Sequence, residues 1–279
     1  MDGIILINKE KGITSRDVVN QICKKLKTNK VGHTGTLDPI ACGLMVICVG
    51  EGLKLVELLT GHDKEYIAKV KIGIKTDTYD ITGKVLEEKE VKLNKDDLIK
   101  VLNSFVGEYY QEVPIYSSVK VNGKKLYEYA RSGIEVTLPK HLVKIGPIEL
   151  ISFDNDSFSF KVNVSSGTYI RSLINDIGNK LGVPLTMEEL LRTKVGEYKL
   201  EDASDIDNLK VIPITEATNI KKVEIKDDLI KKISNGVKID NIYNEKIVMF
   251  LYHNTPIAIY KDDNGILKSY RGFNLNKIK

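Results

Sequence analysis

Asp38 has the clearest chemical potential in this sequence, because of the loop that holds it. Residues 32–43 read GHTGTLDPIACG, with three glycines and one proline. Glycine takes positive φ freely and lets the backbone approach a ligand, while Pro39 fixes the chain directly after the acid. The segment predicts a tight loop that presents Asp38, although an ordinary turn with an Asx interaction has the same composition.

Two more residues could act with this carboxylate. Tyr66 begins a predicted strand, and Arg171 falls in the first turn of a predicted helix. A carboxylate beside an arginine stays ionised and can attack an electrophilic carbon, and an aromatic face suits a nucleic-acid base lifted out of its stack. Each residue also has a structural interpretation, Tyr66 as the edge of the core and Arg171 in a surface ion pair. The residues alone leave both interpretations open.

Other catalytic templates do not fit. The sequence contains neither the GxxxxGK(S/T) phosphate loop nor the GxSxG nucleophile elbow, which disfavours nucleoside triphosphate and serine hydrolase chemistry. His33, Cys42 and Cys48 lie close together in the sequence. A zinc deaminase, however, needs His-x-Glu with Pro-Cys-x-x-Cys, and a structural zinc site needs paired ligand spacing. We therefore expect no metal site.

The composition is that of a soluble globular protein: 279 residues, 42% hydrophobic and 29% charged. The longest apolar run, residues 44–49, is too short to cross a bilayer, and no basic and apolar leader precedes the first strand. The three cysteines, spread over a helix, a loop and a strand, fit reduced thiols. These features predict a cytoplasmic protein with no membrane partner.

Positive charge is concentrated near the end of the chain. The net charge is +4, and residues 221–279 contain 12 Lys and Arg against 7 Asp and Glu, whereas residues 1–220 contain 30 against 31. A basic segment is expected where a protein touches a polyanion, and a solvated lysine-rich surface is the alternative.

Hydrophobic periodicity and turn residues predict mixed helices and strands without an internal repeat. Residues 165–168 are predicted to cap the helix that carries Arg171 and ends at Gly182, and residues 201–226 have the composition of a linker. A helix at 227–234 and strands at 246–252, 256–260 and 266–270 then predict a small all-β appendage. The remaining predicted strands cover 3–8, 44–49, 64–73, 84–88, 144–153 and 158–164, and the remaining helices cover 15–27, 51–59, 94–105 and 126–131.

Six segments between about residues 3 and 198 stand in an order that is specific to one family. They are residues 32–43, 64–66 (KEY), 75–83 (KTDTYDITG), 114–131, 166–173 (SGTYIRSL) and 191–193 (LRT). In that order they resemble the catalytic loop, the active-site tyrosine motif, the polar loop after it, the RNA-gripping insertion, the arginine motif and a pocket segment of the bacterial-type tRNA pseudouridine-55 synthases, the TruB family.

The resemblance implies roles for single residues. Asp38 would be the nucleophile, Tyr66 would stack on the target base, and Arg171 would pair with Asp38. Lys9 would lie in a motif that supports the strand of Tyr66, where Glu10 replaces the proline that the family usually has. The implied substrate-binding residues are His33 (beside the space left by the flipped nucleotide), Leu190 (lining the pocket), Lys9, Gly35 and Tyr169.

The resemblance also implies an α+β fold with a mixed, largely antiparallel sheet and flanking helices, the pseudouridine synthase fold. Residues 1–220 would form the catalytic domain, with an RNA-gripping insertion at about 114–140, and residues 221–279 a small PUA-like RNA-binding β domain. The implied reaction isomerises uridine 55 in the T loop of tRNA to pseudouridine on a flipped-out base, with no cofactor and no metal. The expected partner is the T stem-loop of tRNA, and we expect a monomer.

Two other functions stay open at this point. One is a tRNA-binding protein of the same fold that has lost catalysis, against which the joint presence of Asp38, Tyr66 and Arg171 argues. The other is a nucleoside glycosidase, which would need a second carboxylate opposite Asp38 and would release free uracil. Asp77 or Asp80 could supply that carboxylate.

Overall fold

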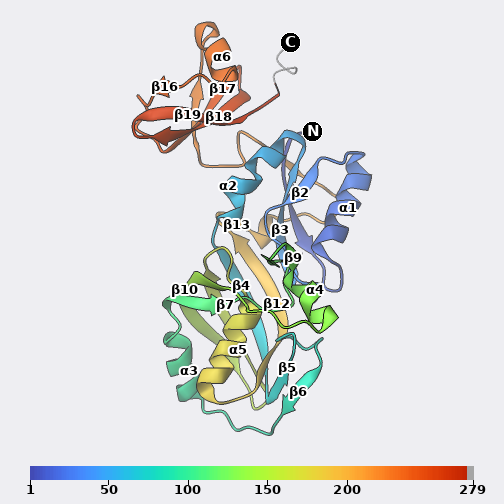
Figure 1. Ribbon diagram of the computed structural model, residues 1–279. Coiled ribbons are helices and arrows are strands. Elements are labelled where there is room, and N and C mark those ends of the chain that lie inside the picture. Colours follow the sequence, from blue (N-terminus) through green and yellow to red (C-terminus); the bar gives the residue numbers. More distant parts are fainter. Residues whose placement is uncertain (275–279) are drawn as a thin grey trace.

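Strands with largely buried side chains form the middle of a ten-stranded sheet. The structure is a computed structural model that describes residues 1–274 (Figure 1). Residues 275–279 of the predicted C-terminal domain lie outside the described residues. The strands of the large sheet are β1 (Gly3–Lys9), β2 (Val31–His33), β3 (Cys42–Val49), β4 (Lys64–Ile72), β7 (Gly107–Glu112), β10 (Lys140–Phe153), β11 (Ser157–Val164), β12 (Leu185–Val195), β13 (Tyr198–Lys199) and β14 (Val211–Pro213).

The strand order in this sheet is β14-β1-β3-β12-β4-β11-β10-β7, with β2 paired to β3 and β13 paired to β12. Only β3 and β12 run parallel, at Leu191↔Cys42 and Arg192↔Gly43, and the other pairs are antiparallel. The predicted mixed, largely antiparallel sheet is confirmed. The parallel contact matters for the site because it places β12 directly beside the end of the Asp38 loop.

Helices cover one face of the large sheet. Thr14 caps the helix at Ser15–Leu26 with a capping box, and Asn94 caps the helix at Lys95–Asn103. Gly182 ends the helix at Ile170–Leu181 in the left-handed conformation. All three of these boundary residues were predicted. The apolar faces of the first, third and fifth helices pack on the sheet in one core cluster. The helices are α1 (Ser15–Leu26), α2 (Val56–Thr60), α3 (Lys95–Asn103), α4 (Leu126–Ser132), α5 (Ile170–Leu181) and α6 (Asp227–Ser234), with short 3₁₀ turns η1 (Gly50–Leu55) and η2 (Leu200–Asp202).

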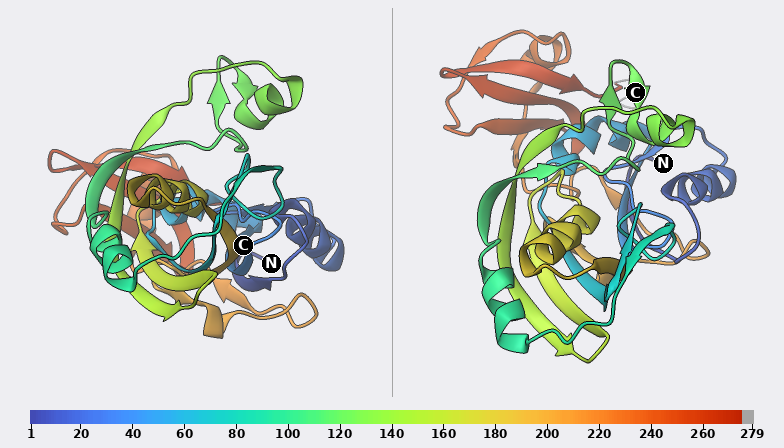
Figure 2. Two further views of the ribbon diagram at one scale, coloured as in Figure 1. Left: turned by 90° about the horizontal axis from the view of Figure 1, so that it is seen from below. Right: turned by 60° about the horizontal axis from the view of Figure 1, so that its bottom comes forward.

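Two small hairpins stand beside the large sheet. One joins β5 (Ile74–Thr76) to β6 (Val85–Glu88), and the other joins β8 (Lys120–Val121) to β9 (Lys124–Lys125) around the predicted Asn122-Gly123 turn. The second hairpin continues into α4, which ends at Gly133 as predicted. Figure 2 shows this insertion standing away from the large sheet.

A second sheet forms at the C-terminal end of the described chain, with the order β15-β17-β18-β19-β16 and α6 beside it. Its apolar side and the outer face of β1 and β3 share one buried cluster, to which Leu6, Leu44, Met249 and Phe273 belong. The two sheets are therefore joined by a continuous core. Figure 1 shows the second sheet at one end of the molecule. The strands are β15 (Lys221–Glu224), β16 (Ile239–Asp240), β17 (Ile247–Tyr252), β18 (Thr255–Asp263) and β19 (Ile266–Gly272).

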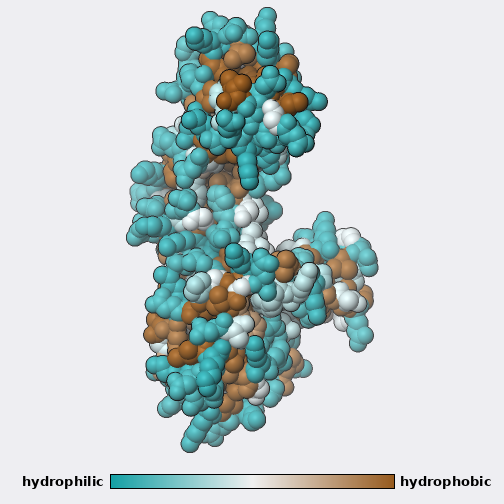
Figure 3. All heavy atoms as spheres, turned by 90° about the vertical axis from the view of Figure 1, so that its left-hand side faces the viewer, coloured by the Kyte–Doolittle hydropathy of each residue, from teal (hydrophilic) through white to brown (hydrophobic). Residues whose placement is uncertain are grey.

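The other edge of the large sheet carries exposed apolar side chains. Tyr110 on β7 is 69% exposed, and its register partner Leu142 on β10 is 55% exposed. Figure 3 looks onto the side of the molecule that carries these strands and α3, and it shows apolar patches within a mostly hydrophilic surface.

Three predictions about elements are wrong. Residues 201–226 are not a free linker, because β14 pairs with β1 and Ser204 bonds to Leu6. Residues 51–59 form a 3₁₀ turn followed by one short helix rather than a single α-helix. Residues 165–168 do not cap α5; its N-cap is Tyr169, which makes no side-chain capping bond.

Candidate active site

Asp38 and Arg171 form a two-point ion pair at the wall of a cavity of about 410 Å³. Nε of Arg171 lies 2.9 Å from Oδ2 of Asp38, and Nη2 donates to Oδ1 at 3.2 Å. The guanidinium is buried, while the Asp38 side chain is 36% exposed. A fork of this kind fixes the orientation of the carboxylate and leaves it accessible from the cavity.

The rest of the guanidinium is held by carbonyl groups from two other segments. Nη1 of Arg171 donates to the carbonyl of Thr78 at 2.9 Å, and Nη2 donates to that of Tyr116 at 3.1 Å. Oδ2 of Asp80 lies 3.7 Å from Nη1 and is itself buried. The polar loop and the insertion that the sequence singled out therefore both converge on Arg171.

The loop around Asp38 is pinned on both sides of the acid. Oγ of Ser15, at the start of α1, accepts from the amide of Leu37 at 2.8 Å and lies 3.0 Å from its carbonyl, while the carbonyl of Pro39 accepts from the amide of Gly12 at 2.7 Å. These bonds hold the backbone of Asp38 in one conformation.

Of the three loop glycines, only Gly43 adopts positive φ, at 104°. A Cβ at this position would lie 2.4 Å from the carbonyl oxygen of Arg192 on the neighbouring strand. The requirement for glycine at Gly43 thus comes from both conformation and close strand contact, whereas Gly32 and Gly35 do not adopt positive φ.

Lys9 lies beneath this loop rather than beside the strand of Tyr66. It is fully buried, and its Nζ donates to the carbonyls of Glu10, Ile13 and, at 3.5 Å, Pro39. Burial lowers its pKa, and the charge of Asp38 acts in the opposite direction. The predicted support of the Tyr66 strand is therefore wrong: Lys9 supports the Asp38 loop and does not line the cavity.

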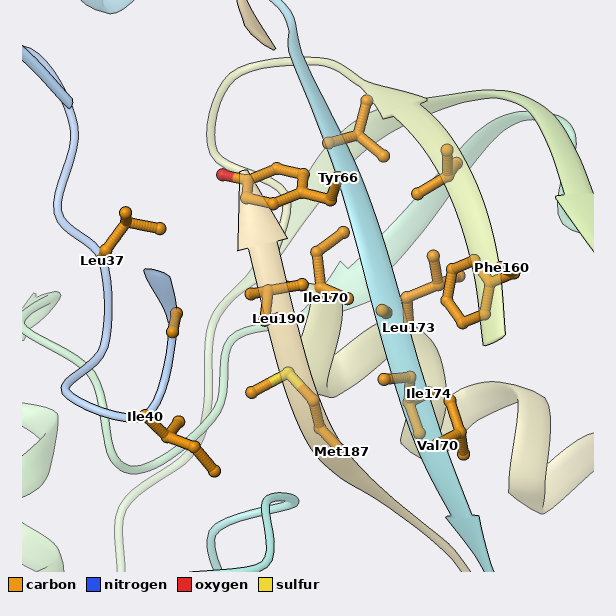
Figure 4. Close-up of a cluster of buried hydrophobic side chains, with 14 of the residues drawn as sticks. Leu37, Ile40, Tyr66, Val70, Phe160, Ile170, Leu173, Ile174, Met187 and Leu190 are labelled. Atoms are coloured by element: carbon orange, nitrogen blue, oxygen red, sulfur yellow. The ribbon is translucent and has the colours of Figure 1, made fainter. Parts of the chain in front are cut away.

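One wall of the cavity is apolar and aromatic (Figure 4). Tyr66, on β4, lies next to Leu190 on β12 and Ile170 at the start of α5, and its hydroxyl points toward the segment that carries Leu37. All three of these side chains are at most 7% exposed. Residues that the sequence analysis named, Gly35, Asp38, Tyr66, Tyr169, Arg171 and Leu190, line the cavity together.

His33 lies next to this group but outside the cavity wall. It is on β2, opposite Ile47, and its Nδ1 is buried without a hydrogen-bond partner within residues 1–274. Burial lowers its pKa, and the charges of Arg192 and Arg16 lower it further. His33 is thus held as a neutral imidazole near neutral pH.

Sequence reasoning did not identify Gln111, which positions the arginine. Gln111 is buried on β7, and its Oε1 accepts from the backbone N–H of Tyr169 at 2.7 Å. Its Nε2 donates to the hydroxyl of Tyr109 at 2.7 Å, and that hydroxyl donates to Asp176 at 3.2 Å. Gln111 therefore replaces the missing side-chain cap of α5, two residues before Arg171.

Two buried cations on the cavity wall, Lys64 and Arg192, were also not identified. The sequence indicated Lys64 only as the first residue of the tyrosine motif at 64–66, and Arg192 only as part of the pocket segment at 191–193. Burial lowers the pKa of Lys64 to about 8, with a further contribution from the charge of Arg192. A signal was present in the sequence, since a lysine at the start of a buried strand needs a specific partner.

Within residues 1–274 no group of three or more His, Cys, Asp or Glu side chains could hold a metal ion. No helix in the described chain has the length and apolar character to span a membrane.

The same fold is found in solved structures. Two solved structures share it: a Cbf5–Nop10–Gar1 complex, with a TM-score of 0.72, 24% identity and coverage of 97% of this chain and 84% of that chain, and an H/ACA ribonucleoprotein bound to a substrate RNA, with a TM-score of 0.71, 23% identity and coverage of 98% and 85%.

Sequence comparison defines the family. The model of the TruB family pseudouridylate synthase N-terminal domain matches residues 23–170. Relatives called tRNA pseudouridine synthase B are 39% identical in Clostridium tetani, covering 100% of this chain and 99% of the relative, and 42% identical in Bacillus subtilis, covering 93% of each. The chain belongs to the TruB family of pseudouridylate synthases and is an isomerase that forms pseudouridine, as the resemblance predicted.

Proposed function

We propose that this enzyme acts on tRNA and converts uridine 55 in the T loop to pseudouridine. The relatives that match almost the whole chain are called tRNA pseudouridine synthases, which supports tRNA as the substrate. The cavity, at about 410 Å³, has a volume typical of small-ligand sites and suits a single nucleotide. The burial of Tyr66 and Leu190 on its wall supports a base that leaves the RNA stack, because a stacked base cannot reach a buried wall.

We assign Asp38 the role of nucleophile. The observation that carries this role is its two-point pairing with Arg171, since the guanidinium aims an ionised carboxylate into the cavity opposite Tyr66. In the reaction the bond from N1 of uracil to the ribose breaks, the base rotates, and C5 bonds to the same ribose carbon. C5 loses a proton and N1 gains one, so the uridine keeps its composition and oxidation state and no redox partner is needed.

Tyr66 and Leu190 are proposed to hold the base while it is detached from the ribose. Tyr66 offers an aromatic face and Leu190 an apolar contact on the neighbouring strand. Base stacking on an aromatic side chain contributes about 1–3 kcal/mol. A base held in this way can rotate without leaving the cavity.

The glycosidase alternative lacks its second carboxylate. Asp38 is the only acidic residue among the described residues that line the cavity. Asp80 is buried and accepts bonds from Thr78 and Thr82, and Asp77 accepts from the amide of Lys84. Oδ2 of Asp80 also lies 3.7 Å from Nη1 of Arg171, and Oδ2 of Asp77 accepts from the hydroxyl of Tyr116. Both carboxylates therefore help to hold residues of the site, but neither lines the cavity as a second catalytic carboxylate would.

We propose that two further parts of the chain grip the RNA. The insertion brings Tyr116 and Tyr127 to the cavity, and Lys125 and Arg131 lie over the ring of Tyr127. The basic residues 221–274 are proposed to form an RNA-binding unit, because exposed lysines are concentrated on β15 and α6.

The test is incubation of the purified protein with unmodified tRNA, followed by mapping of pseudouridine through carbodiimide-dependent stops in reverse transcription. We expect one new stop in the T loop. Asp38→Asn keeps the shape of the side chain but removes the nucleophile, so turnover should fall by about 10⁴-fold or more while the dissociation constant for tRNA changes little. Turnover of Asp38→Asn within tenfold of the wild type, or release of free uracil, contradicts the mechanism.

A further inference from the structure

The active-site cavity contains more positive charge than the proposed chemistry uses. Asp38 and Arg171 neutralise each other, but Lys64 and Arg192 form no ion pair with a carboxylate within residues 1–274. Arg192 is 1% exposed and Lys64 is 7% exposed. Two cations removed from water on one wall are unfavourable unless an anion or a set of hydrogen-bond acceptors compensates them.

Arg192 keeps part of its guanidinium available. Its Nε donates to the carbonyl of Leu44 at 2.7 Å, and Nη2 donates to that of Gly35 at 3.1 Å. Nη1 donates to no group among the described residues, and it lies 3.4 Å from the position that a Cβ of residue 35 would take. Because Gly35 has no side chain, this edge of the guanidinium is reachable from the cavity.

Lys64 supplies charge next to that edge. Its Nζ donates to the carbonyls of Thr60 and His62 at 2.9 and 2.7 Å and to Oγ of Ser166 at 3.2 Å. Its Cε lies 3.7 Å from the Cβ position of residue 35, so both cations border the same point. Thr60, Ser166 and Thr168 also line the cavity.

We propose that Lys64 and Arg192, with Gly35 between them, form an anion subsite that binds a backbone phosphodiester adjacent to the target uridine. This subsite rests on the proposed function, since it shares the cavity with the base pocket at Tyr66. A phosphodiester carries one negative charge, which the ammonium of Lys64 can stabilise through space while its three N–H donors stay with protein acceptors. The unesterified oxygens of the phosphate can accept from the free Nη1 edge of Arg192. Anchoring the phosphate there would hold the ribose near Asp38 while the base turns.

The experiment changes the RNA first, so that the protein stays intact. In a tRNA T stem-loop, each of the two phosphates beside the target uridine is replaced in turn by an uncharged methylphosphonate. The matched control carries a charged phosphorothioate at the same linkage. Every RNA has 2′-deoxyribose at that linkage, so that the RNAs differ only in the phosphate group. At one of the two linkages the methylphosphonate should raise the dissociation constant of the wild type by about tenfold to a hundredfold over the phosphorothioate.

The same RNAs are then bound to the Lys64→Gln and Lys69→Gln variants. Lys69→Gln is the control, because it removes a charge from the same strand outside the cavity. The methylphosphonate penalty should shrink in Lys64→Gln and stay at the wild-type value in Lys69→Gln, and thermal melting checks that both variants are folded. A wild type that binds both methylphosphonate RNAs like their controls, or an equal penalty in all three proteins, overturns the subsite. Turnover of unmodified RNA is measured separately, so failure of the proposed function is seen independently.

Discussion

At the scale of single residues, the site depends on the fork of Arg171, which contacts Asp38, Thr78 and Tyr116 at once. Arg171→Lys keeps the charge but can reach only part of this set. We expect turnover to fall by about a hundredfold or more, because a point charge no longer fixes the carboxylate. Single-turnover pseudouridine formation measures the effect. Wild-type turnover in a folded Arg171→Lys variant contradicts the assigned role.

Lys64 predicts a pH dependence of RNA binding. Its pKa of about 8 means that it loses its charge from about pH 7 to about pH 9, so tRNA affinity should fall as pH rises through this range. The groups that face it are Arg192, which lowers the pKa, and Asp63, which raises it. Dissociation constants across this range measure the effect, and Lys64→Gln should lack the step.

The stability of the free protein should move in the opposite direction. The ordinary pKa of lysine is 10.5, so between about pH 8 and 10.5 the unfolded chain binds more protons at Lys64 than the folded chain does. This group alone therefore makes the free energy of unfolding rise with pH. A fall in affinity that accompanies unfolding, or that persists in Lys64→Gln, would show that Lys64 is not responsible.

At the scale of elements, the position of α5 depends on a bond from another strand. Gln111→Leu leaves the amide of Tyr169 without an acceptor, which should lower the free energy of unfolding by about 1–3 kcal/mol and reduce turnover because Arg171 follows two residues later. Tyr109→Phe keeps that bond and should affect turnover less. Chemical denaturation and turnover measure both variants. Equal stability of Gln111→Leu and the wild type would contradict the capping role.

Elements with regular periodicity were predictable from the sequence, and irregular ones were not. The alternation in β4 placed Tyr66, Ala68 and Val70 on one face, and the caps of α1 and α3 marked their starts. The long strand β12 was missed because bulges between Met187 and Glu189 and between Arg192 and Lys194 interrupt its period of two. Periodicity alone could not place Leu190 and Arg192 on the cavity wall, and only the family resemblance assigned both residues to the pocket.

The cap of α5 shows the same limit at the site itself. Local sequence favoured the hydroxyl residues at 165–168, but these make a turn of their own, with Oγ1 of Thr168 donating to the carbonyl of Ser165. The bond that replaces the cap comes from Gln111, far away in sequence. Asp38, Tyr66 and Arg171 were found because motifs identify them, whereas residues that act through tertiary contacts carry no local pattern.

At the scale of the whole molecule, the charge of the C-terminal sheet can be changed without disturbing its core. Lys221 and Lys222 on β15 and Lys231 and Lys232 on α6 are exposed. Replacement of all four by Gln should weaken tRNA binding and flatten the plot of log K against log salt by about 0.7–0.9 for each phosphate that the variant no longer neutralises. The modified uridine should not change.

A matched control removes four exposed lysines at the opposite end of the large sheet, Lys84, Lys89, Lys92 and Lys95. This variant should keep the wild-type salt slope. If both quadruple variants bind tRNA with the same reduced slope, the effect is one of net charge alone, and residues 221–274 are not an RNA-binding unit.

The shared core and the return of β14 to β1 also determine what happens when the chain is cut. Residues 205–208, in the loop between η2 and β14, are exposed apart from the half-buried Ile206. The fragment that follows the cut stays hydrogen-bonded to β1 through β14. It also stays packed in the shared cluster through Ile214, Met249 and Phe273. Limited proteolysis in this loop should therefore give a nicked protein whose two fragments elute together on a sizing column and separate only in denaturant. Once the chain has folded, the peptide link between η2 and β14 is dispensable.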